Sequence, residues 1–290
     1  MSDVLKISDL YLRFRGYTGV TEVLHGISLN IRAGERVALV GESGSGKSVT
    51  ARIVLGILQE LRTAQVQGGL EFEGQDLNKL SASQWHDLRG TAMSIIFQDP
   101  TSSLNPVFTI ETQFAEVLRR RDAKMTDAAA NARAAELLNS VSIHDHERVL
   151  NSYPFQLSGG MNQRVVIAMA LANQPSLLIA DEPGTALDVT VQAQTLKLMH
   201  DLVEQSGTAV FFISHNLGVV REFADRVYVI YRGRIVEHGP TAAIFENPGH
   251  AYTRALMAAV PRITGGGIPE IDDVDVAFLD PVVTHDGGAT

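Results

Sequence analysis

Residues 41–48 read GESGSGKS, and this stretch decides the fold. It fits the pattern G-x-x-x-x-G-K-[ST] at every fixed position, which is typical of a loop whose backbone amides cradle phosphate oxygens. The apolar run VALV precedes it, and VTARIVLGIL follows at helical spacing. The order of strand, glycine-rich loop and helix aims the positive end of the helix dipole at a bound anion. We therefore expect Lys47 to reach the β- and γ-phosphates of a nucleotide, and the Ser48 hydroxyl to ligate Mg²⁺.

Length and composition restrict the class of protein. The chain has 290 residues, of which 45% are hydrophobic, enough for one large domain or two smaller ones with a substantial core. A net charge of −9 disfavours a nucleic-acid partner. The chain has no cysteine, which excludes disulfides, zinc–thiolate sites and cysteine-ligated iron–sulfur clusters and fits a cytosolic protein. The start, MSDVLKISDL, is too polar for a signal peptide, and no apolar run approaches the roughly 18 residues of a membrane span.

The pattern along the chain predicts a parallel sheet with attached layers. Continuous apolar strands that alternate with helices indicate a parallel sheet covered on both faces. We expect buried strands at 94–98, 176–183 and 208–215, and helices across 110–148 and 189–207. Antiparallel signals at 4–14, 23–40 and 70–80 predict a smaller β layer, and 227–239 predicts a hairpin that turns at Arg232–Gly233. The acidic, glycine-rich end after Pro261 is expected to be loosely ordered.

Polar side chains lie at the ends of three predicted buried strands. The carboxyl ends of parallel strands meet at the ligand crevice. Asp181 would support the hydration shell of Mg²⁺, and Glu182 could polarise a water for in-line attack on the γ-phosphate. Gln98 could ligate Mg²⁺ or orient that water, and His215 could donate a hydrogen bond to the γ-phosphate. Each of these residues alone also fits a solvated or structural role, and the phosphate loop favours the functional interpretation.

The stretch LSGGM at 157–161 precedes an apolar helix that we expect to begin at about Asn162. Two adjacent glycines cost a helix roughly 1 kcal/mol each relative to alanine, which suggests a use for the bare backbone. The Ser158 hydroxyl, the amides of Gly159 and Gly160 and the helix dipole together suit an anion. If the loop at 41–48 holds its own nucleotide, the anion at this second helix could belong to another subunit. A serine-capped core helix is the alternative interpretation.

These motifs together resemble the ATP-binding subunits of ABC transporters, from about residue 4 to residue 260. The resemblance rests on GESGSGKS, Gln98, LSGGM, LLIADEP, Ala186-Leu187-Asp188 and His215. The longer stretches FQDPTSSLNP, LSGGMNQRVVIAMALA, ALDVTVQAQTL and GHAYTRALMAAVP are similar to the dipeptide, oligopeptide and nickel importer branch.

The resemblance implies an α/β fold of the P-loop NTPase, RecA-like type. A parallel sheet core would carry an N-terminal antiparallel β subdomain and an inserted α-helical subdomain. The implied division places the core and β layer at 1–98 and 158–245, the helical subdomain at 99–157 and a C-terminal extension at 246–290.

The resemblance further implies an ATPase that powers an importer of peptides, nickel or a related small solute. Two cassettes would pair head to tail, so that the phosphate loop of one and the LSGGM segment of the other sandwich each ATP. Glu182 would be the catalytic base, His215 the switch histidine and Gln98 the link to the helical subdomain, while Asp188 would cross the dimer interface. Phe14 is the expected adenine-stacking residue, with Tyr17 as the alternative.

The implied site residues fall into two sets. The expected nucleotide contacts are Phe14, Gly41, Ser43, Gly44, Ser45, Gly46, Lys47, Ser48, Val49, Ser158, Gly159, Gly160, Met161 and Asp188. The expected metal ligands are Ser48, Gln98 and Asp181. ATP and Mg²⁺ are the implied cofactors, and the lack of cysteine implies that the iron–sulfur cluster of some members is absent.

The implied partners are membrane-spanning permease subunits, a second cassette that is the same or a related chain, and indirectly an extracytoplasmic solute-binding protein. The chain would then lie on the cytoplasmic face of the membrane. A soluble ABC ATPase acting on DNA or ribosomes is disfavoured by the single cassette and the acidity. A silent regulatory cassette is disfavoured by Glu182 and His215. Gly184 stands where the branch usually has threonine, and Ala251 where it often has proline.

Overall fold

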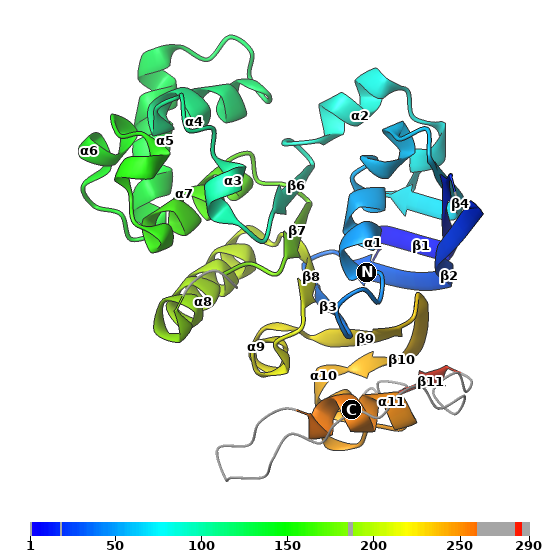
Figure 1. Cartoon of the computed structure of the whole chain (residues 1–290). Helices are drawn as coiled ribbons and strands as arrows, with labels where there is room; N and C mark the ends of the chain where they lie inside the picture. Colours follow the sequence, from blue (N-terminus) through cyan, green and yellow to red (C-terminus); the bar gives the residue numbers. More distant parts are fainter. Residues whose placement is uncertain (1, 18, 185–187, 260–281, 286–290) are drawn as a thin grey trace. The chain divides into compact units, whose positions relative to one another are not determined.

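The computed structural model describes residues 2–17, 19–184, 188–259 and 282–285, and the chain divides into two compact units. The first unit comprises Met1–Lys79 and Phe211–Thr290, and the second comprises Leu80–Val210. Figure 1 labels most of the strands and helices of both. No helix among the described residues is long and apolar enough to cross a membrane.

An antiparallel sheet opens the first unit. Its strand order is β2-β1-β4-β5, and each neighbouring pair is antiparallel. The strands are β1 (Asp3–Gly16), β2 (Gly19–Arg32), β4 (Ala64–Phe72) and β5 (Gln75–Asp76). Leu5, Ile7, Leu10 and Leu12 of β1 are buried, so one strand supplies much of this core. The predicted antiparallel β layer at the N-terminus is confirmed.

The rest of the first unit is built on a second set of strands in the order β11-β10-β9-β3-β8. β3 pairs with β9 in parallel, β9 and β10 form an antiparallel hairpin, and β10 pairs with β11 in parallel. The strands are β3 (Arg36–Val40), β8 (Ala209–Ser214), β9 (Arg226–Tyr231), β10 (Arg234–Pro240) and β11 (Val283–Thr284). The helices are α1 (Lys47–Val54), α9 (Leu217–Phe223), α10 (Thr241–Glu246) and α11 (Ala251–Ala258).

Short 3₁₀ turns at Leu58–Glu60 and Leu77–Lys79 complete the first unit. The chain enters this unit from the second one within β8, whose residues are all buried. The hairpin turns at Arg232 and Gly233, which both have positive φ, as the sequence predicts. In β3, residues 37–40 are wholly buried, which explains the unbroken apolar run before the glycine-rich loop.

The second unit combines two parallel strands with a group of helices. β6 (Met93–Ile96) pairs in parallel with β7 (Leu177–Asp181). The helices are α2 (Ala82–Leu88), α3 (Pro100–Ser103), α4 (Ile110–Arg119), α5 (Asp127–Ser140), α6 (His146–Leu150), α7 (Gly159–Leu171) and α8 (Val189–Ser206), with a 3₁₀ turn at Pro154–Gln156. Figure 1 shows α4, α5, α6 and α7 gathered together, and these helices contact one another.

Three boundaries differ from the sequence predictions. The helical region predicted at 110–148 consists of three helices, because Thr109 and Thr126 cap the starts of α4 and α5. The strand predicted at 94–98 ends at Ile96, so Gln98 lies two residues beyond it. The helix predicted from about Asn162 begins at Gly159, because the Ser158 side chain caps it.

Candidate functional site

The glycine-rich loop joins the buried end of β3 to the start of α1. An added Cβ at Gly41 would lie 2.1 Å from the carbonyl oxygen of Ile230, and one at Gly46 would lie 2.6 Å from Leu24 Cδ2. Gly46 also has a φ of 111° at the N-cap of α1, a conformation that side chains disfavour. Gly41 is therefore required by close packing against backbone, and Gly46 is favoured by its left-handed φ and by the nearby Leu24 side chain.

Backbone carbonyls of this loop hold the Lys47 side chain in place. Its side chain is buried, at 5% exposure, and Nζ donates hydrogen bonds to the carbonyl oxygens of Gly41 at 2.8 Å and Glu42 at 2.7 Å. A buried ammonium is costly unless it is hydrogen-bonded, so these carbonyls stabilise its position. The loop thus presents a positive charge at the start of α1, beside Ser48, where an anion would gain most.

Glu182 and Gln98 are brought together in the second unit. β7 ends at Asp181, which is 8% exposed, and Glu182 follows with a φ of 50°, which is uncommon for a residue other than glycine. Gln98 Nε2 donates a hydrogen bond to Glu182 Oε2 at 3.0 Å. Two of the three predicted catalytic residues therefore contact each other directly.

The LSGGM segment and Asp188 lie at the starts of two neighbouring helices. The Ser158 hydroxyl accepts a hydrogen bond from the Met161 amide at 3.3 Å, and the Asp188 carboxylate accepts one from the Val191 amide at 3.0 Å. An added Cβ at Gly160 would lie 2.9 Å from Val191 Cγ1, so α7 and α8 approach closely there. Both the predicted anion site and the serine cap are features of the same helix start.

Two further predicted residues, Phe14 and His215, belong to the first unit. Phe14 is half-buried in β1, opposite Thr21 of β2 and Ala64 of β4. The alternative adenine-stacking residue, Tyr17, is fully exposed after β1. His215 directly follows β8 and is exposed. Their contacts with a nucleotide stay predictions.

The predicted site residues are divided between the two units. The first unit contains Phe14, Gly41, Ser43, Gly44, Ser45, Gly46, Lys47, Ser48, Val49 and His215; the second contains Gln98, Ser158, Gly159, Gly160, Met161, Asp181, Glu182 and Asp188. Ala186 and Leu187, which contributed to the resemblance, lie outside the described residues. Among the described residues, no cluster of three or more histidine and acidic side chains could hold a metal by itself.

One contact of the phosphate loop was not foreseen from the sequence. The amide of Glu42, the second residue of the loop, donates a hydrogen bond to the Tyr252 hydroxyl at 3.0 Å. Tyr252 lies 210 residues further along the chain, in α11. Local patterns cannot reveal such a pair, and only the family-like HAYT stretch around Tyr252 marked this segment.

Comparison with known proteins supports the motif assignment over most of the chain. The sequence profile described as "ABC transporter" matches residues 24–185. A second profile, described as "Oligopeptide/dipeptide transporter, C-terminal region", matches residues 236–273.

Curated relatives align over nearly the whole chain. A protein of Sinorhizobium fredii, named as a probable peptide ABC transporter ATP-binding protein, is 47% identical over 97% of this chain and 84% of its own length. The oligopeptide transport ATP-binding protein OppD of Bacillus subtilis is 46% identical over 92% of this chain and 75% of its own length. The dipeptide transport ATP-binding protein DppD of Lactococcus lactis is 45% identical over 90% and 74%.

Solved structures confirm the predicted fold class. A dimeric ATP-binding cassette in a post-hydrolysis state, bound to ADP and Pi, superposes with a TM-score of 0.72 at 28% identity, covering 82% of this chain and 98% of the other. A cassette of the ABC transporter complex cbiONQ from Clostridium perfringens gives a TM-score of 0.70 at 26% identity, covering 85% and 92%. With the phosphate loop and the Gln98–Glu182 pair in place, these matches lead to one conclusion: the chain belongs to the ABC transporter family, as one of its ATP-hydrolysing, ATP-binding proteins.

Proposed function

We propose that this chain drives an importer of peptides. The names of the relatives support a peptide cargo, because they are peptide, oligopeptide and dipeptide transport proteins. The match of residues 236–273 to the C-terminal region of such transporters supports the same cargo class. The observation that carries the ATPase part is the buried Lys47 ammonium, held by two carbonyls over the glycine-rich loop. A soluble ATPase outside transport and a silent regulatory cassette are not favoured.

The phosphate loop binds the triphosphate in this proposal. Lys47 and the start of α1 supply the positive charge and the dipole that β- and γ-phosphates require. Ser43, Gly44, Ser45 and Gly46 supply amides, and Phe14 stacks on the adenine. When bound, Mg²⁺ neutralises the phosphates, and Ser48, Gln98 and Asp181 would hold it, since hydroxyl, amide and carboxylate oxygens are the donors that this ion prefers.

Glu182 acts as the general base for the attacking water in this proposal. The hydrogen bond from Gln98 Nε2 to Glu182 Oε2 supports this role, because it fixes the orientation of the carboxylate. It also leaves the amide oxygen of Gln98 as the atom that would accept from a water or bind a metal. His215 contacts the γ-phosphate and positions the same water.

A second cassette, identical or related, completes each ATP site in this proposal. The exposed starts of α7 and α8 support the assignment, because Ser158, Gly159 and Asp188 are open to solvent and available to a partner. The dimeric state of a cassette that superposes on this chain supports it too. Gly160 would then add its amide to the phosphates of the partner's nucleotide, and Met161 would contact that nucleotide beside it.

Membrane-spanning subunits dock on the second unit in this proposal. Exposed aromatic and aliphatic side chains gather where the start of α4 meets the segment before α7, joined by the hydrogen bond from the Ile110 amide to the Ser152 carbonyl at 3.0 Å. This apolar patch consists of Val107, Phe108, Tyr153 and Phe155. Large exposed apolar side chains in contiguous groups are typical of interaction surfaces.

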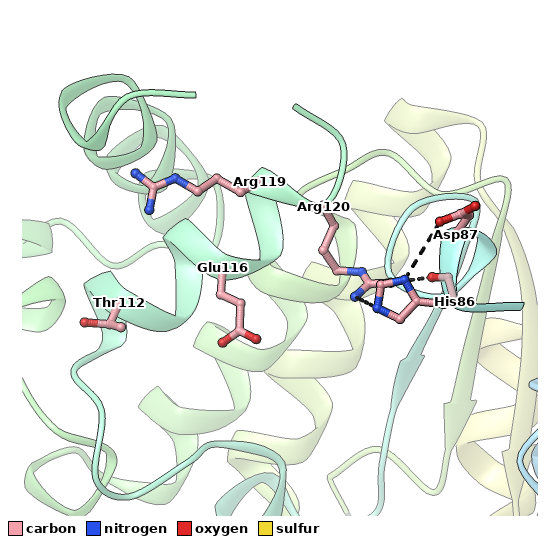
Figure 2. Close-up of a pocket in the computed structure, with 6 residues that line it drawn as sticks. All are labelled: His86, Asp87, Thr112, Glu116, Arg119 and Arg120. Carbon is pink, nitrogen blue, oxygen red and sulfur yellow. Dashed lines mark hydrogen bonds and ion pairs between the residues drawn. The ribbon is translucent and has the colours of Figure 1, made fainter. Parts of the chain in front are cut away.

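A charged pocket lies on α4 beyond the apolar patch. Figure 2 shows Arg120 reaching from the end of α4 toward His86, with Asp87 beside His86 and with Glu116 and Thr112 nearer the start of the same helix. The pocket has a volume of about 670 Å³, and Arg120 Nε donates to the Arg89 carbonyl at 2.9 Å. We propose that the same membrane subunit binds this charged pocket and the apolar patch. This docking would place the chain at the cytoplasmic face of the membrane.

Peptide uptake tests the proposed cargo and the role of the loop together. In cells that carry the cognate membrane subunits, Lys47→Ala is expected to reduce uptake of labelled di- and oligopeptides to background. Lys79→Ala is the matched control, because Lys79 is exposed and pairs with Asp76 in the first unit at 3.0 Å. Wild-type peptide uptake with Lys47→Ala, or a defect confined to nickel uptake, would contradict the proposal.

A further inference from the structure

The C-terminal helix α11 contacts the phosphate loop. The Tyr252 hydroxyl accepts the hydrogen bond from the Glu42 amide at 3.0 Å, and the Tyr252 side chain is completely buried. Its ring packs against Tyr231 at the end of β9, with the ring centroids 4.3 Å apart. Burial raises the pKa of Tyr252, so the hydroxyl stays neutral across the physiological range. The roles proposed for the loop, which are binding of phosphates and of Mg²⁺, do not involve this tyrosine.

The bond to Tyr252 fixes the orientation of one peptide group. In a trans peptide the N–H and the C=O point in opposite directions, and the described chain has no cis peptide. The Glu42 amide and the Gly41 carbonyl belong to the same peptide plane. Because the amide donates to Tyr252 on one side, the carbonyl is aimed to the other side, where it accepts from Lys47 Nζ at 2.8 Å. Tyr252 therefore acts on Lys47 through the Gly41–Glu42 peptide.

A second contact holds the loop from the β9–β10 turn. The Gly233 amide donates to the Ser45 carbonyl at 2.9 Å. The loop is thus tied at both ends to residues of the C-terminal half of the first unit. Preorganised amides bind an anion with less loss of conformational freedom than mobile ones.

A buried carboxylate holds the residues just before Tyr252. Glu237 of β10 is inaccessible to solvent and accepts hydrogen bonds from the Gly249 amide at 2.7 Å and the His250 amide at 3.1 Å. His250 Nδ1 then accepts from the Tyr252 amide at 3.1 Å and caps α11. Burial alone would raise the pKa of Glu237, but its hydrogen bonds outweigh burial and lower the pKa, so the carboxylate stays charged.

The same carboxylate also contacts the residue that follows the C-terminal strand β11. His285 Nε2 lies 2.6 Å from Glu237 Oε1, directly after β11 pairs with β10. A series of contacts therefore runs from His285 through Glu237, His250 and Tyr252 to Glu42 of the phosphate loop. All of these residues belong to the first unit.

We propose that Tyr252 is a positioning residue for the phosphate loop, so that the C-terminal region sets the affinity of this cassette for ATP. The inference rests on the proposed ATP-binding role of the loop. In this proposal, the segment around α11 orients the phosphate loop in addition to completing the fold. A purely structural role would instead predict lost stability with no specific change in nucleotide binding.

The test is Tyr252→Phe, which removes one oxygen atom and keeps the ring. The dissociation constant for Mg-ATP is expected to rise about three- to tenfold, as for the loss of one hydrogen bond. In the steady state, KM for ATP should rise while kcat at saturating ATP is kept, since Glu182 is untouched. Both constants are measured at a temperature well below the thermal midpoint of each variant.

The matched control is Tyr228→Phe. Tyr228 is also buried in the first unit, but its hydroxyl bonds to Asn30 and Arg226 instead of the loop. This variant is expected to lower the thermal midpoint and leave the ATP dissociation constant unchanged. Hydrogen exchange should accelerate in the 41–46 segment for Tyr252→Phe only.

Three outcomes would overturn the inference. These are an unchanged ATP dissociation constant in Tyr252→Phe, equal effects of both variants, or a fall in kcat without a change in KM. In each case wild-type chain that still binds and hydrolyses ATP leaves the proposed function standing. Failure of the wild-type chain to bind ATP would instead remove the proposed function itself.

Discussion

At Gly41 a single missing side chain lets two parts of the first unit meet. The loop backbone passes so close to β9 that an added Cβ would lie 2.1 Å from the Ile230 carbonyl oxygen. The same residue accepts the hydrogen bond from Lys47. The glycine that the motif demands for phosphate binding is therefore also required for packing, and sequence alone gives only the first reason.

Alanine substitution tests whether Gly41 is required for packing as well as for phosphate binding. Gly41→Ala is expected to lower the free energy of unfolding by more than about 2 kcal/mol, because the clash is with backbone and cannot be relieved by a rotamer change. Gly74→Ala is the matched control: Gly74 has a φ of 77° but nothing within 4 Å of an added Cβ. It should cost only the strain of a left-handed residue, about 1–2 kcal/mol. Urea unfolding measures both, and equal losses would refute the packing argument.

At the scale of elements, the apolar patch beside α4 is the surface to test. Phe155 is 71% exposed and its ring stacks on Tyr153 with the centroids 5.5 Å apart. Phe155→Ser is expected to leave folding and ATP affinity intact and to reduce the amount of membrane subunits that co-purify with the chain. Removing an apolar anchor from an interface costs on the order of 1–2 kcal/mol, or about a tenfold loss of affinity.

A second exposed apolar residue serves as the control for this surface. Val20 is 55% exposed on β2, in the first unit. Val20→Ser should retain the membrane subunits at the wild-type level. Retention by Phe155→Ser equal to that of the control would argue against docking at the apolar patch.

Elements with a strong period or an unbroken apolar run could be predicted, and short or capped ones could not. β7 and β8 are buried throughout, as are residues 37–40 of β3, and the apolar runs of these strands predict them directly. The predicted start of α7 at about Asn162 is three residues too late, because the Ser158 side chain caps the helix and Gly159 is its first residue. β11 has two residues and depends on pairing with β10, so no local pattern marks it.

In the candidate site, too, local motifs could be predicted from the sequence, whereas contacts between residues far apart in the chain could not. The loop at 41–48 and the pair Asp181–Glu182 could be read from sequence, because motif and strand end coincide. The Gln98–Glu182 hydrogen bond and the Tyr252–Glu42 hydrogen bond join residues 84 and 210 positions apart, and only the fold brings them together. The roles of Phe14 and His215, and the predicted boundaries at 98 and 157, stay predictions.

At the scale of the whole molecule, binding and hydrolysis of ATP are expected to be separable. Binding is assigned to Lys47 and the phosphate loop, whereas hydrolysis is assigned to Glu182, oriented by Gln98 at 3.0 Å. Each residue lies in a different unit. A change at Glu182 should therefore leave the nucleotide bound and stop the chemistry.

The most direct test is phosphate release by the full chain, purified with its membrane subunits, as wild type and as Glu182→Gln. Loss of a general base is expected to lower kcat by about two to four orders of magnitude, while bound ATP is retained. Glu222→Gln, on the exposed face of α9, should hydrolyse ATP like the wild type. Turnover by Glu182→Gln at the wild-type rate, with ATP bound, would contradict the account.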